Sequence, residues 1–406
     1  MEKSPKHEAM AAHSQAPATN SHEAAELSRW LMAEPHQDDD NTAFVRALAE
    51  RLGAAGVPLW RLRYALMTMH PEVLWRSVFW RADEGASVID QSHQRLEDPF
   101  YTSSPIAVVR QSGAPLRVRL RPGELPYALC VELRDLGGTD FYAQPLPFAN
   151  GQIGYITFVT QAPEGFSDAA LALLEEIRPF VARRVELASA YYATRALLEV
   201  YLGNNAARRV LAGQFQRGRG ELIEAAIWFS DVRGFTQLSD RTEPARVIEI
   251  LDAHFDAVAG AVADHGGEVL KFIGDAVLAI FPLGEDPCTA CRRALAAAED
   301  AFGALARMNQ GLTARGEPAL EIGIGLHRGR VMYGNIGARN RLDFTVISSS
   351  VNEASRLESL CKPLGVRLAL SAAFVQTAEV QDSVVDLGQQ ALKGVRAPLQ
   401  VYTVRT

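Results

Sequence analysis

The stretch from Ile227 to Thr236 reads IWFSDVRGFT, and the stretch from Leu270 to Phe281 reads LKFIGDAVLAIF. In each stretch an apolar run of β-type residues meets an aspartate beside a glycine turn, at Asp231 and at Asp275. A carboxylate at the end of a buried strand needs a cation or a hydrogen-bond donor to offset its lost hydration. Two such carboxylates that converge would form a site for hard divalent cations carrying a phosphate substrate.

The pattern around these two stretches predicts one α+β domain over residues 221–406. Strands are indicated by β-branched and aromatic runs, and helices by proline or threonine starts followed by apolar residues at helical spacing. The expected strands include Ala225–Ser230, the hairpin Glu268–Phe281, Glu321–Leu326, Arg330–Tyr333 and Leu342–Ile347, and the expected helices begin near Pro244, Thr289 and Val351. The order β-α-β-β-α-β predicts a ferredoxin-like antiparallel sheet with helices.

The two aspartate motifs resemble the metal-binding segments of class III nucleotidyl cyclases, and the resemblance covers nearly all of residues 221–406. It implies an adenylate cyclase catalytic domain that converts ATP to cyclic AMP with two Mg²⁺ or Mn²⁺ ions. In that family the positions of Asp231 and Asp275 hold both ions, and the position of Val232 adds a backbone carbonyl. The segment Gly234, Phe235 and Thr236 would then offer backbone N–H groups to the triphosphate at a helix start.

The same resemblance assigns the base and the transition state. Lys271 matches the lysine that donates to adenine N1, and Thr345 matches the second base selector, seven residues before Asn352. Asn352 and Arg356 match the N-x-x-x-R motif, in which asparagine orients the ribose and arginine stabilises the growing phosphoryl charge. Lys393 resembles a late lysine that reaches the phosphates. The family divides these groups between two protomers, so a homodimer is expected to build two composite sites.

One departure keeps other readings open. The chain has Ser348-Ser349-Ser350 where family members usually have a glycine followed by aspartate or asparagine. Loss of a glycine at Ser348 would remove access to positive φ and slow the enzyme. The alternatives are therefore a nucleotide-binding pseudocyclase, acting as a regulatory module, and a guanylate cyclase. A diguanylate cyclase lacks support, because its G-G-D/E-E-F signature is absent.

The N-terminal half predicts a regulatory region. Residues 1–40 are polar and alanine-rich and are expected to be a disordered tail. Residues 41–180 resemble a GAF-like sensor domain in element order, with Ile106–Val109 expected as a strand, and would bind an unknown small-molecule or protein effector. Residues 181–220 predict a signalling helix and linker, with Leu187, Tyr191, Thr194, Leu198 and Tyr201 at heptad spacing.

Composition excludes several classes of protein. The 406 residues carry a formal net charge of −7, which argues against a nucleic-acid or anionic-membrane binder. No apolar run is long enough for membrane insertion, so the expected location is cytoplasmic. Cys288 and Cys291 form a lone C-x-x-C without a second pair, which favours packing over a metal or redox role. His327, alone at a strand end, is expected to be structural.

Overall fold

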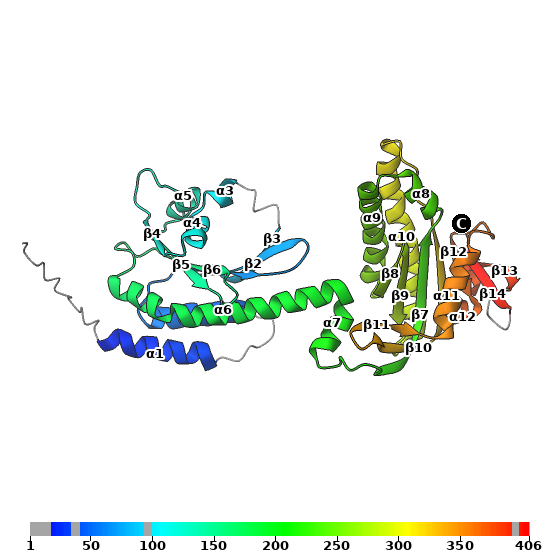
Figure 1. Cartoon of the computed structure of the whole chain (residues 1–406), viewed down its shortest axis with the longest axis horizontal. Helices are drawn as coiled ribbons and strands as arrows, with labels where there is room; N and C mark the ends of the chain where they lie inside the picture. The colour runs from blue at the N-terminus through cyan, green and yellow to red at the C-terminus, as the bar shows by residue number, and fades with distance from the viewer. Residues whose placement is uncertain (1–17, 34–40, 93–98, 392–397, 406) are drawn as a thin grey trace, which may run out of the picture. The chain divides into compact units, whose positions relative to one another are not determined.

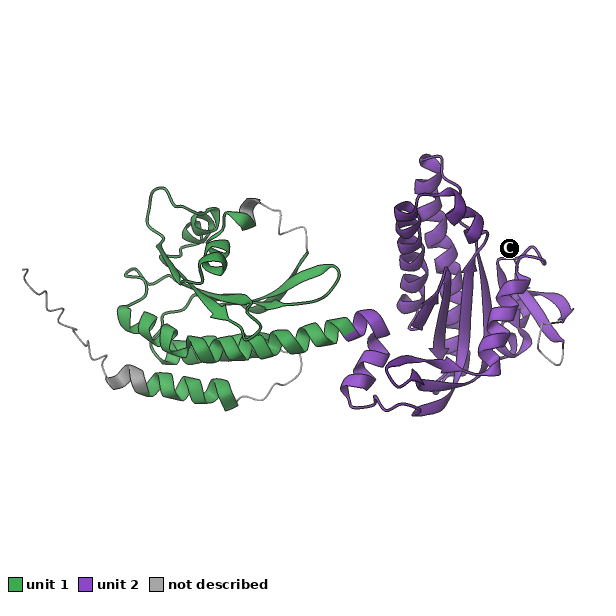
Figure 2. Ribbon diagram, viewed as in Figure 1, with its two compact units in different colours: residues 1–197 green, residues 198–406 purple. Residues whose placement is uncertain are grey.

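The structure, a computed structural model, describes residues 18–33, 41–92, 99–391 and 398–405. It divides into two compact units between Leu197 and Leu198 (Figure 2). The first unit contains α1 (Ala18–Ala33), α2 (Asn41–Ala54), β1 (Arg61–Met67), β2 (Val73–Arg81), β3 (Gly85–Ser92), α3 (Pro99–Thr102), α4 (Pro105–Ser112), β4 (Leu116–Arg119), α5 (Ala128–Asp135), β5 (Asp140–Pro147), β6 (Ile153–Thr160) and most of α6 (Asp168–Leu202).

The first unit is built on a six-stranded antiparallel sheet in the order β3-β2-β1-β6-β5-β4. Residues of α1, α2 and α6 form one hydrophobic core with this sheet, and residues of α4 and α5 form a second one (Figure 1). This α+β arrangement is compatible with a GAF-like domain, but the sensor role stays a prediction.

Two expectations for this unit are wrong. The sequence predicts disorder through residue 40, yet Ala18–Ala33 form α1, because Ala24, Leu27 and Leu31 are spaced to share one buried face. The sequence also predicts a strand at Ile106–Val109, which instead lies in helix α4. The Ser104 hydroxyl accepts the Ala107 N–H at 3.2 Å, and Pro105 starts the helix. These start signals outweigh the β-preference of the branched residues.

The second unit carries one large sheet with helices on both faces. Its elements are α7 (Asn204–Leu211), β7 (Gly220–Val232), α8 (Phe235–Arg241), α9 (Pro244–Asp264), β8 (Glu268–Ile273), β9 (Ala276–Pro282), α10 (Pro287–Ala314), β10 (Ile322–Ala338), β11 (Arg341–Ile347), α11 (Ser349–Leu360), β12 (Leu368–Ser371), α12 (Ala372–Ala378), the short 3₁₀ turn η2 (Gln381–Ser383), β13 (Val384–Gln390) and β14 (Leu399–Val404).

The main path of this sheet is β13-β14-β12-β10-β7-β9-β8, and β11 pairs with β10 beside it. All pairs are antiparallel except β10 with β12. Residues of α9, α10 and α12 pack in the core on one face, whereas Ala206 of α7 and Ala354 of α11 pack on the other. The predicted α+β fold class is confirmed.

Two segments are longer than the sequence predicts. The expected strands Glu321–Leu326 and Arg330–Tyr333 are parts of the single strand β10, which pairs with β7 along Ile322–Gly334. Continuous pairing to a central strand therefore carries β10 through Gly329. The expected linker helix after residue 181 is the second half of α6, which begins at Asp168.

Candidate active site

The two aspartates predicted to bind metal meet at one backbone amide. Asp231 lies one residue before the end of β7, and Asp275 lies in the turn between β8 and β9. The Val232 N–H donates to Oδ1 of Asp231 at 3.1 Å and to Oδ2 of Asp275 at 3.2 Å. The turn depends on Gly274, whose φ of 66° is in the left-handed region that favours glycine. The sheet thus brings both carboxylates to one place.

The negative charges of Asp231 and Asp275 repel each other. Burial, together with the hydrogen bond and the charge of Asp275, raises the pKa of the Asp231 carboxyl to about 6. Two carboxylates that crowd each other are stabilised by a divalent cation, which prefers oxygen ligands. The donor set of two carboxylates and the nearby Val232 carbonyl therefore fits magnesium or manganese. Among the described residues, no group of three or more His, Cys, Asp or Glu side chains is placed to hold a metal ion together.

A carboxylate that the sequence analysis missed lies close to this pair. Glu358 is half-buried on α11. Burial raises its pKa to about 7, and the charges of Asp231 and Asp275 act in the same direction. The sequence did not indicate a role for Glu358, because its position on the helix, two residues after Arg356, does not show which strand its side chain contacts. Only the packing of the helix decides that contact.

The residues predicted to select the base lie on β8 and β11, two strands that do not pair in the sheet. The Lys271 ammonium on β8 is 2.9 Å from Oδ2 of Asp343 on β11. Thr345, two residues further along β11, is 6% exposed, and its hydroxyl has no hydrogen-bond partner among the residues that the structure describes. A cavity of about 500 Å³ is lined by Lys271 and Asp343, together with Phe272, Arg341 and Phe344. Thr345 is not among the residues that line this cavity, but its buried hydroxyl, without a partner among the described residues, could bond to a polar ligand that reaches it.

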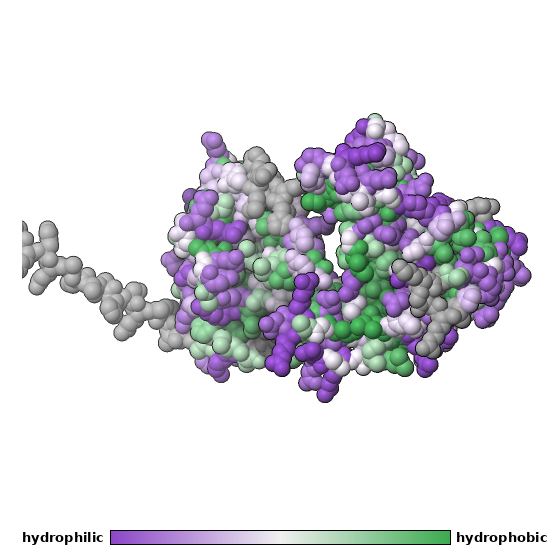
Figure 3. Space-filling view, turned by 45° about the vertical axis from the view of Figure 1, so that its right-hand side comes forward, coloured by the Kyte–Doolittle hydropathy of each residue, from purple (hydrophilic) through white to green (hydrophobic). Residues whose placement is uncertain are grey.

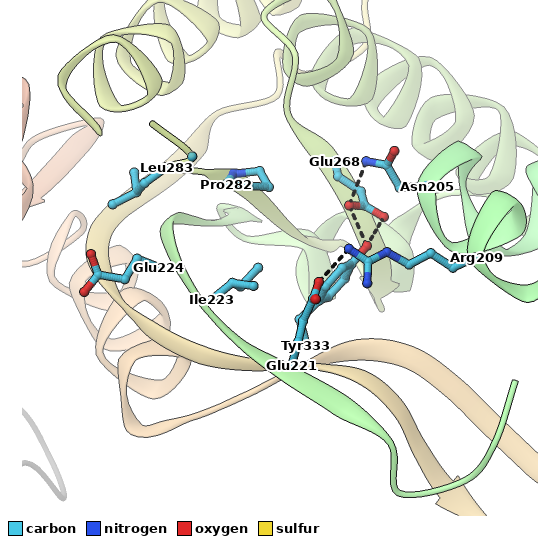
Figure 4. Close-up of a pocket in the computed structure, with 10 residues that line it drawn as sticks. Asn205, Arg209, Glu221, Ile223, Glu224, Glu268, Pro282, Leu283 and Tyr333 are labelled. Atoms are coloured by element: carbon cyan, nitrogen blue, oxygen red, sulfur yellow. Dashed lines mark hydrogen bonds and ion pairs between the residues drawn. The ribbon is translucent and has the colours of Figure 1, made fainter. Parts of the chain in front are cut away.

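Strand β8 is fixed at its start by a buried polar network. The Tyr333 hydroxyl lies 2.8 Å from both carboxylate oxygens of Glu268, and the Asn205 amide donates to Glu268 at 3.1 Å. Arg209 packs over the Tyr333 ring at 4.9 Å and pairs with Glu221 at 2.6 Å (Figure 4). These contacts tie α7 to the strand that carries Lys271.

The predicted transition-state residues lie on the outer side of α11. Asn352 and Arg356 are exposed, whereas Ala354 and Leu357 of the same helix are fully buried. The structure thus brings Asn352 and Arg356 together on one helical surface and directs them to solvent. The serine at 348 causes no strain, because its φ of −172° is extended backbone and its hydroxyl accepts the Val351 N–H at 3.3 Å. Residue 348 thus needs no positive φ in this chain, whereas the effect of the three serines on turnover stays a prediction.

The structure describes some of the remaining predicted residues and leaves Lys393 outside the described part of the chain. Gly234 has a φ of 72° and precedes α8, so Phe235 and Thr236 form the first helical turn. His327 is buried, its pKa is lowered to about 4 by burial, and its Nε2 is 3.4 Å from Glu353. These features agree with a structural role for His327.

The C-x-x-C cysteines are free thiols in the structure. Cys291 is buried in the helix-covered core, and burial raises the pKa of its thiol to about 12. The Cys288 thiol donates to the Ala378 carbonyl at 3.5 Å. A thiol whose pKa is raised in this way is unreactive at neutral pH, which agrees with a packing role.

Comparison with known proteins gives the class of this second unit. Residues 220–406 match the family model of the adenylate and guanylate cyclase catalytic domain, and this part of the chain belongs to the class III cyclase family. The adenylate cyclase of Anabaena cylindrica is 33% identical over 193 residues, which cover 46% of this chain and 38% of that protein. Adenylate cyclase 1 of Rhizobium meliloti is 33% identical over 185 residues, covering 45% of this chain and 27% of that protein.

Solved structures give related matches. The adenylyl cyclase CyaB of P. aeruginosa is 29% identical with a TM-score of 0.41, over 46% of this chain and 96% of that one. The guanylyl cyclase Cya2 is 31% identical with a TM-score of 0.41, over 46% and 93%. The chain spans about a third of the length of the curated relatives it matches. In the part of the chain that the structure describes, no helix is both long and apolar enough to cross a membrane.

Proposed function

We propose that this chain is a cytoplasmic adenylate cyclase that converts ATP to 3′,5′-cyclic AMP and pyrophosphate. The observation that carries this proposal is the convergence of Asp231 and Asp275 on the Val232 amide. This arrangement suits a two-cation site, and the identity of about a third with curated adenylate cyclases supports the same activity. When bound, two magnesium or manganese ions would polarise the ribose 3′-hydroxyl and neutralise the pyrophosphate leaving group.

The chain's own residues would do the rest. Asp231 and Asp275, with the Val232 carbonyl, hold the cations. The amides of Gly234, Phe235 and Thr236, and the Lys393 ammonium, bind the triphosphate. The Asn352 amide orients the ribose, while the Arg356 guanidinium stabilises negative charge on the α-phosphoryl oxygens as the 3′-oxygen attacks. Arginine suits this task because its planar fork stays charged at any physiological pH.

Adenine recognition rests on two side chains. The Lys271 ammonium donates to N1 of adenine, and the Thr345 hydroxyl accepts from the 6-amino group. The buried hydroxyl of Thr345, which has no partner in the described part of the chain, supports this role because such a group gains a hydrogen bond when the base enters. Guanine presents an N1–H, from which the Lys271 ammonium cannot accept, whereas the Thr345 hydroxyl could rotate and donate to the 6-oxygen; discrimination against guanine would therefore rest mainly on Lys271.

The proposed active form is a homodimer. Asn352 and Arg356 are exposed, and a second copy could place them against the aspartates. Large apolar side chains of the strands β8, β10 and β11 are also exposed, namely Phe272, Ile273, Met332 and Ile347, with exposures of 44–56%. Apolar residues on the second unit reach the surface in patches rather than singly (Figure 3). Covering such a patch with an identical chain stabilises a two-fold dimer.

Regulation is assigned to the N-terminal part, with residues 41–180 as the domain that binds an unidentified small-molecule or protein effector. The segment over 181–220 connects it to the catalytic domain at 221–406. Continuity of α6 from Asp168 to Leu202 supports this role, because one helix spans the connection. Contacts of Asn205 and Arg209 with the catalytic sheet give the connecting segment a fixed attachment there.

The test is the product formed by the purified full-length chain. ATP and GTP are supplied separately with Mg²⁺ or Mn²⁺, and cyclic nucleotides are separated by chromatography. We expect cyclic AMP from ATP and little cyclic GMP from GTP. The double variant Lys271→Glu with Thr345→Cys should reverse or abolish this preference. A folded, dimeric chain that yields no cyclic nucleotide with either metal would be a pseudocyclase, and preferred use of GTP would make it a guanylate cyclase.

A further inference from the structure

Helix α11 lies unusually close to strand β10 along a line of glycines. A Cβ atom added to Gly323 would overlap Oε1 of Glu358, and one added to Gly325 would overlap the Ala354 carbonyl. A side chain at Gly325 would therefore displace the helix backbone, whereas one at Gly323 would displace the Glu358 carboxylate. The carboxylate of Glu358 occupies the space that a side chain at 323 would otherwise fill.

That space is next to the first metal aspartate. Gly323 of β10 pairs directly with Asp231 of β7. Side chains of directly paired residues project from the same face, with Cβ atoms about 4.5–5.5 Å apart. The Glu358 carboxylate, lying over Gly323, is therefore a neighbour of the Asp231 carboxylate on the same face of the sheet. Glu358 thus becomes a third acidic group beside Asp231 and Asp275.

No basic side chain neutralises Glu358 directly. Among the described residues it has no ion pair within 4.0 Å, and the nearby Arg233 instead donates to the Val366 carbonyl and pairs with Glu321 at 3.6 Å. Burial and the charges of the two aspartates raise the pKa of Glu358 to about 7, while Arg233 opposes them. Three carboxyl groups beside one guanidinium that is engaged with other partners leave this place in need of positive charge.

We propose that Glu358 is a positioning residue of the divalent-cation site, acting on the bound ion through its water rather than as a direct ligand. The inference rests on the proposed function, which places the cations at Asp231 and Asp275. The role is indirect because the Glu358 carboxylate lies over Gly323, which pairs with Asp231, and not at the Val232 amide where Asp231 and Asp275 meet. Hydrogen bonds from outer carboxylates to ligands and metal-bound water commonly tune metal affinity.

This role gives α11 two functions in the proposed dimer. Its outer face carries Asn352 and Arg356 toward the site of the second copy. Its inner face carries Glu358 toward the aspartates of its own chain. One helix would then contribute side chains to both active sites of the dimer. Its close packing on Gly323 and Gly325 would therefore affect the geometry of each site.

The competing explanation is that Glu358 only fills space beneath α11. In that case its charge is irrelevant, and an isosteric neutral side chain should serve equally well. The two explanations differ in cation affinity, which is measurable without turnover. We therefore choose Mn²⁺ binding to the full-length chain, measured by titration calorimetry in the absence of nucleotide.

Four chains are compared: wild type, Glu358→Gln, Glu353→Gln and Asp231→Asn. Glu353 is the matched control, since it is also half-buried on α11 but faces His327. We expect Glu358→Gln to weaken Mn²⁺ binding about tenfold, as outer-shell changes commonly do, and Glu353→Gln to stay within twofold. If Glu358→Gln binds Mn²⁺ with wild-type affinity while Asp231→Asn binds it clearly more weakly, the inference about Glu358 is wrong and the proposed metal site stands. Wild-type affinity in Asp231→Asn would instead overturn the proposed metal site.

A second variant keeps the inference testable if Glu358→Gln does not fold. Glu358→Asp keeps the charge and withdraws it by one methylene from the space over Gly323. Melting temperature and circular dichroism identify folded protein before each titration. The expected loss of Mn²⁺ affinity is about threefold, between wild type and the neutral variant. Unchanged affinity in a folded Glu358→Asp chain would contradict a position-dependent role.

Discussion

The Lys271 ammonium on β8 and the Asp343 carboxylate on β11 lie 2.9 Å apart although these strands do not pair, so the proposed base-selecting lysine has a carboxylate partner within its own chain. The hydrogen bond from Lys271 is the main cause of the lowered pKa of Asp343. Their side chains are 31% and 52% exposed, so the pair is partly screened by solvent. The ion pair therefore contributes more to the orientation of the Lys271 side chain than to the stability of the fold.

Asp343→Asn should accordingly separate binding from stability. We expect the melting temperature to change by little, because exposed pairs contribute about 0–1 kcal/mol. The KM for ATP should rise by about fivefold at most, since 1.4 kcal/mol corresponds to tenfold. Steady-state kinetics and thermal melts measure both quantities. Glu249→Gln, which removes an exposed pair with Arg246 on α9, is the control and should leave KM unchanged.

Asp231→Asn should abolish cyclisation and yet stabilise the metal-free protein. The folded pKa of about 6 exceeds the ordinary value of 3.8, so the folded chain binds more protons than the unfolded one between these values. The free energy of unfolding of the wild type must then fall as pH rises from about 4 to 6. The variant lacks this loss, and should gain on the order of 1 kcal/mol at pH 7 after allowance for solvent screening.

Urea unfolding with a chelator present, at pH 4 and at pH 7, measures this difference. The gain should be present at pH 7 and absent at pH 4. Activity is measured in parallel with Mg²⁺, and a fall of at least about 10²–10³ is expected, comparable with the loss of one oxyanion donor. Near-normal turnover in this variant would contradict the assignment of Asp231 to the cations.

Mixing two inactive chains tests the shared site. Asp231→Ala removes one half of the site, and Arg356→Ala removes the other. In a mixed dimer one site carries both lesions and the other carries none. Random pairing makes half the dimers mixed, so about a quarter of wild-type activity should return. Subunit exchange is verified first with labelled chains, after which continued inactivity would show that one chain completes its own site.

Truncation tests the attachment of α7. Ala206 and Ala207 of this helix are buried in the core of the second unit, so a fragment that begins at Leu211 loses part of that core. A fragment from Leu198 keeps it. We expect the Leu198 fragment to be folded and to cyclise ATP without effector response, and the Leu211 fragment to melt at lower temperature. Equal melting temperatures would mean that α7 adds nothing to the catalytic unit.

Tyr333→Phe tests the network at the start of β8. The change leaves the buried Glu268 carboxylate without its hydroxyl donor, and only the Asn205 amide remains. Loss of a partner for a buried charged group costs about 1–3 kcal/mol. Chemical denaturation of the variant measures this, and Tyr201→Phe serves as the control because Tyr201 is 80% exposed. If the loss in the free energy of unfolding is no larger than in the control variant, the network does not contribute measurably to stability.

The sequence by itself determined the local chemistry of the catalytic unit. An apolar run ending in an aspartate and a glycine is enough to place β7 and the β8–β9 hairpin, because strand period and turn conformation are local properties. The spacing of Asn352 and Arg356 likewise fixed them on one helical surface. The error at Ile106–Val109 has a local cause, because the start signals at Ser104 and Pro105 outweigh the β-preference of the branched residues. The error over residues 18–33 has a tertiary cause, because a core shared with distant elements buries one face of that helix.

Only the tertiary structure decided which side chains meet across elements. The pairing of Lys271 with Asp343, the free hydroxyl of Thr345 and the placement of Glu358 over Gly323 all depend on strand register and helix seating. Register is set by burial of whole faces, which no short window of sequence contains. The sequence therefore predicted the two aspartates of the site, whereas the packing of α11 on β10 decided that the Glu358 carboxylate lies beside them.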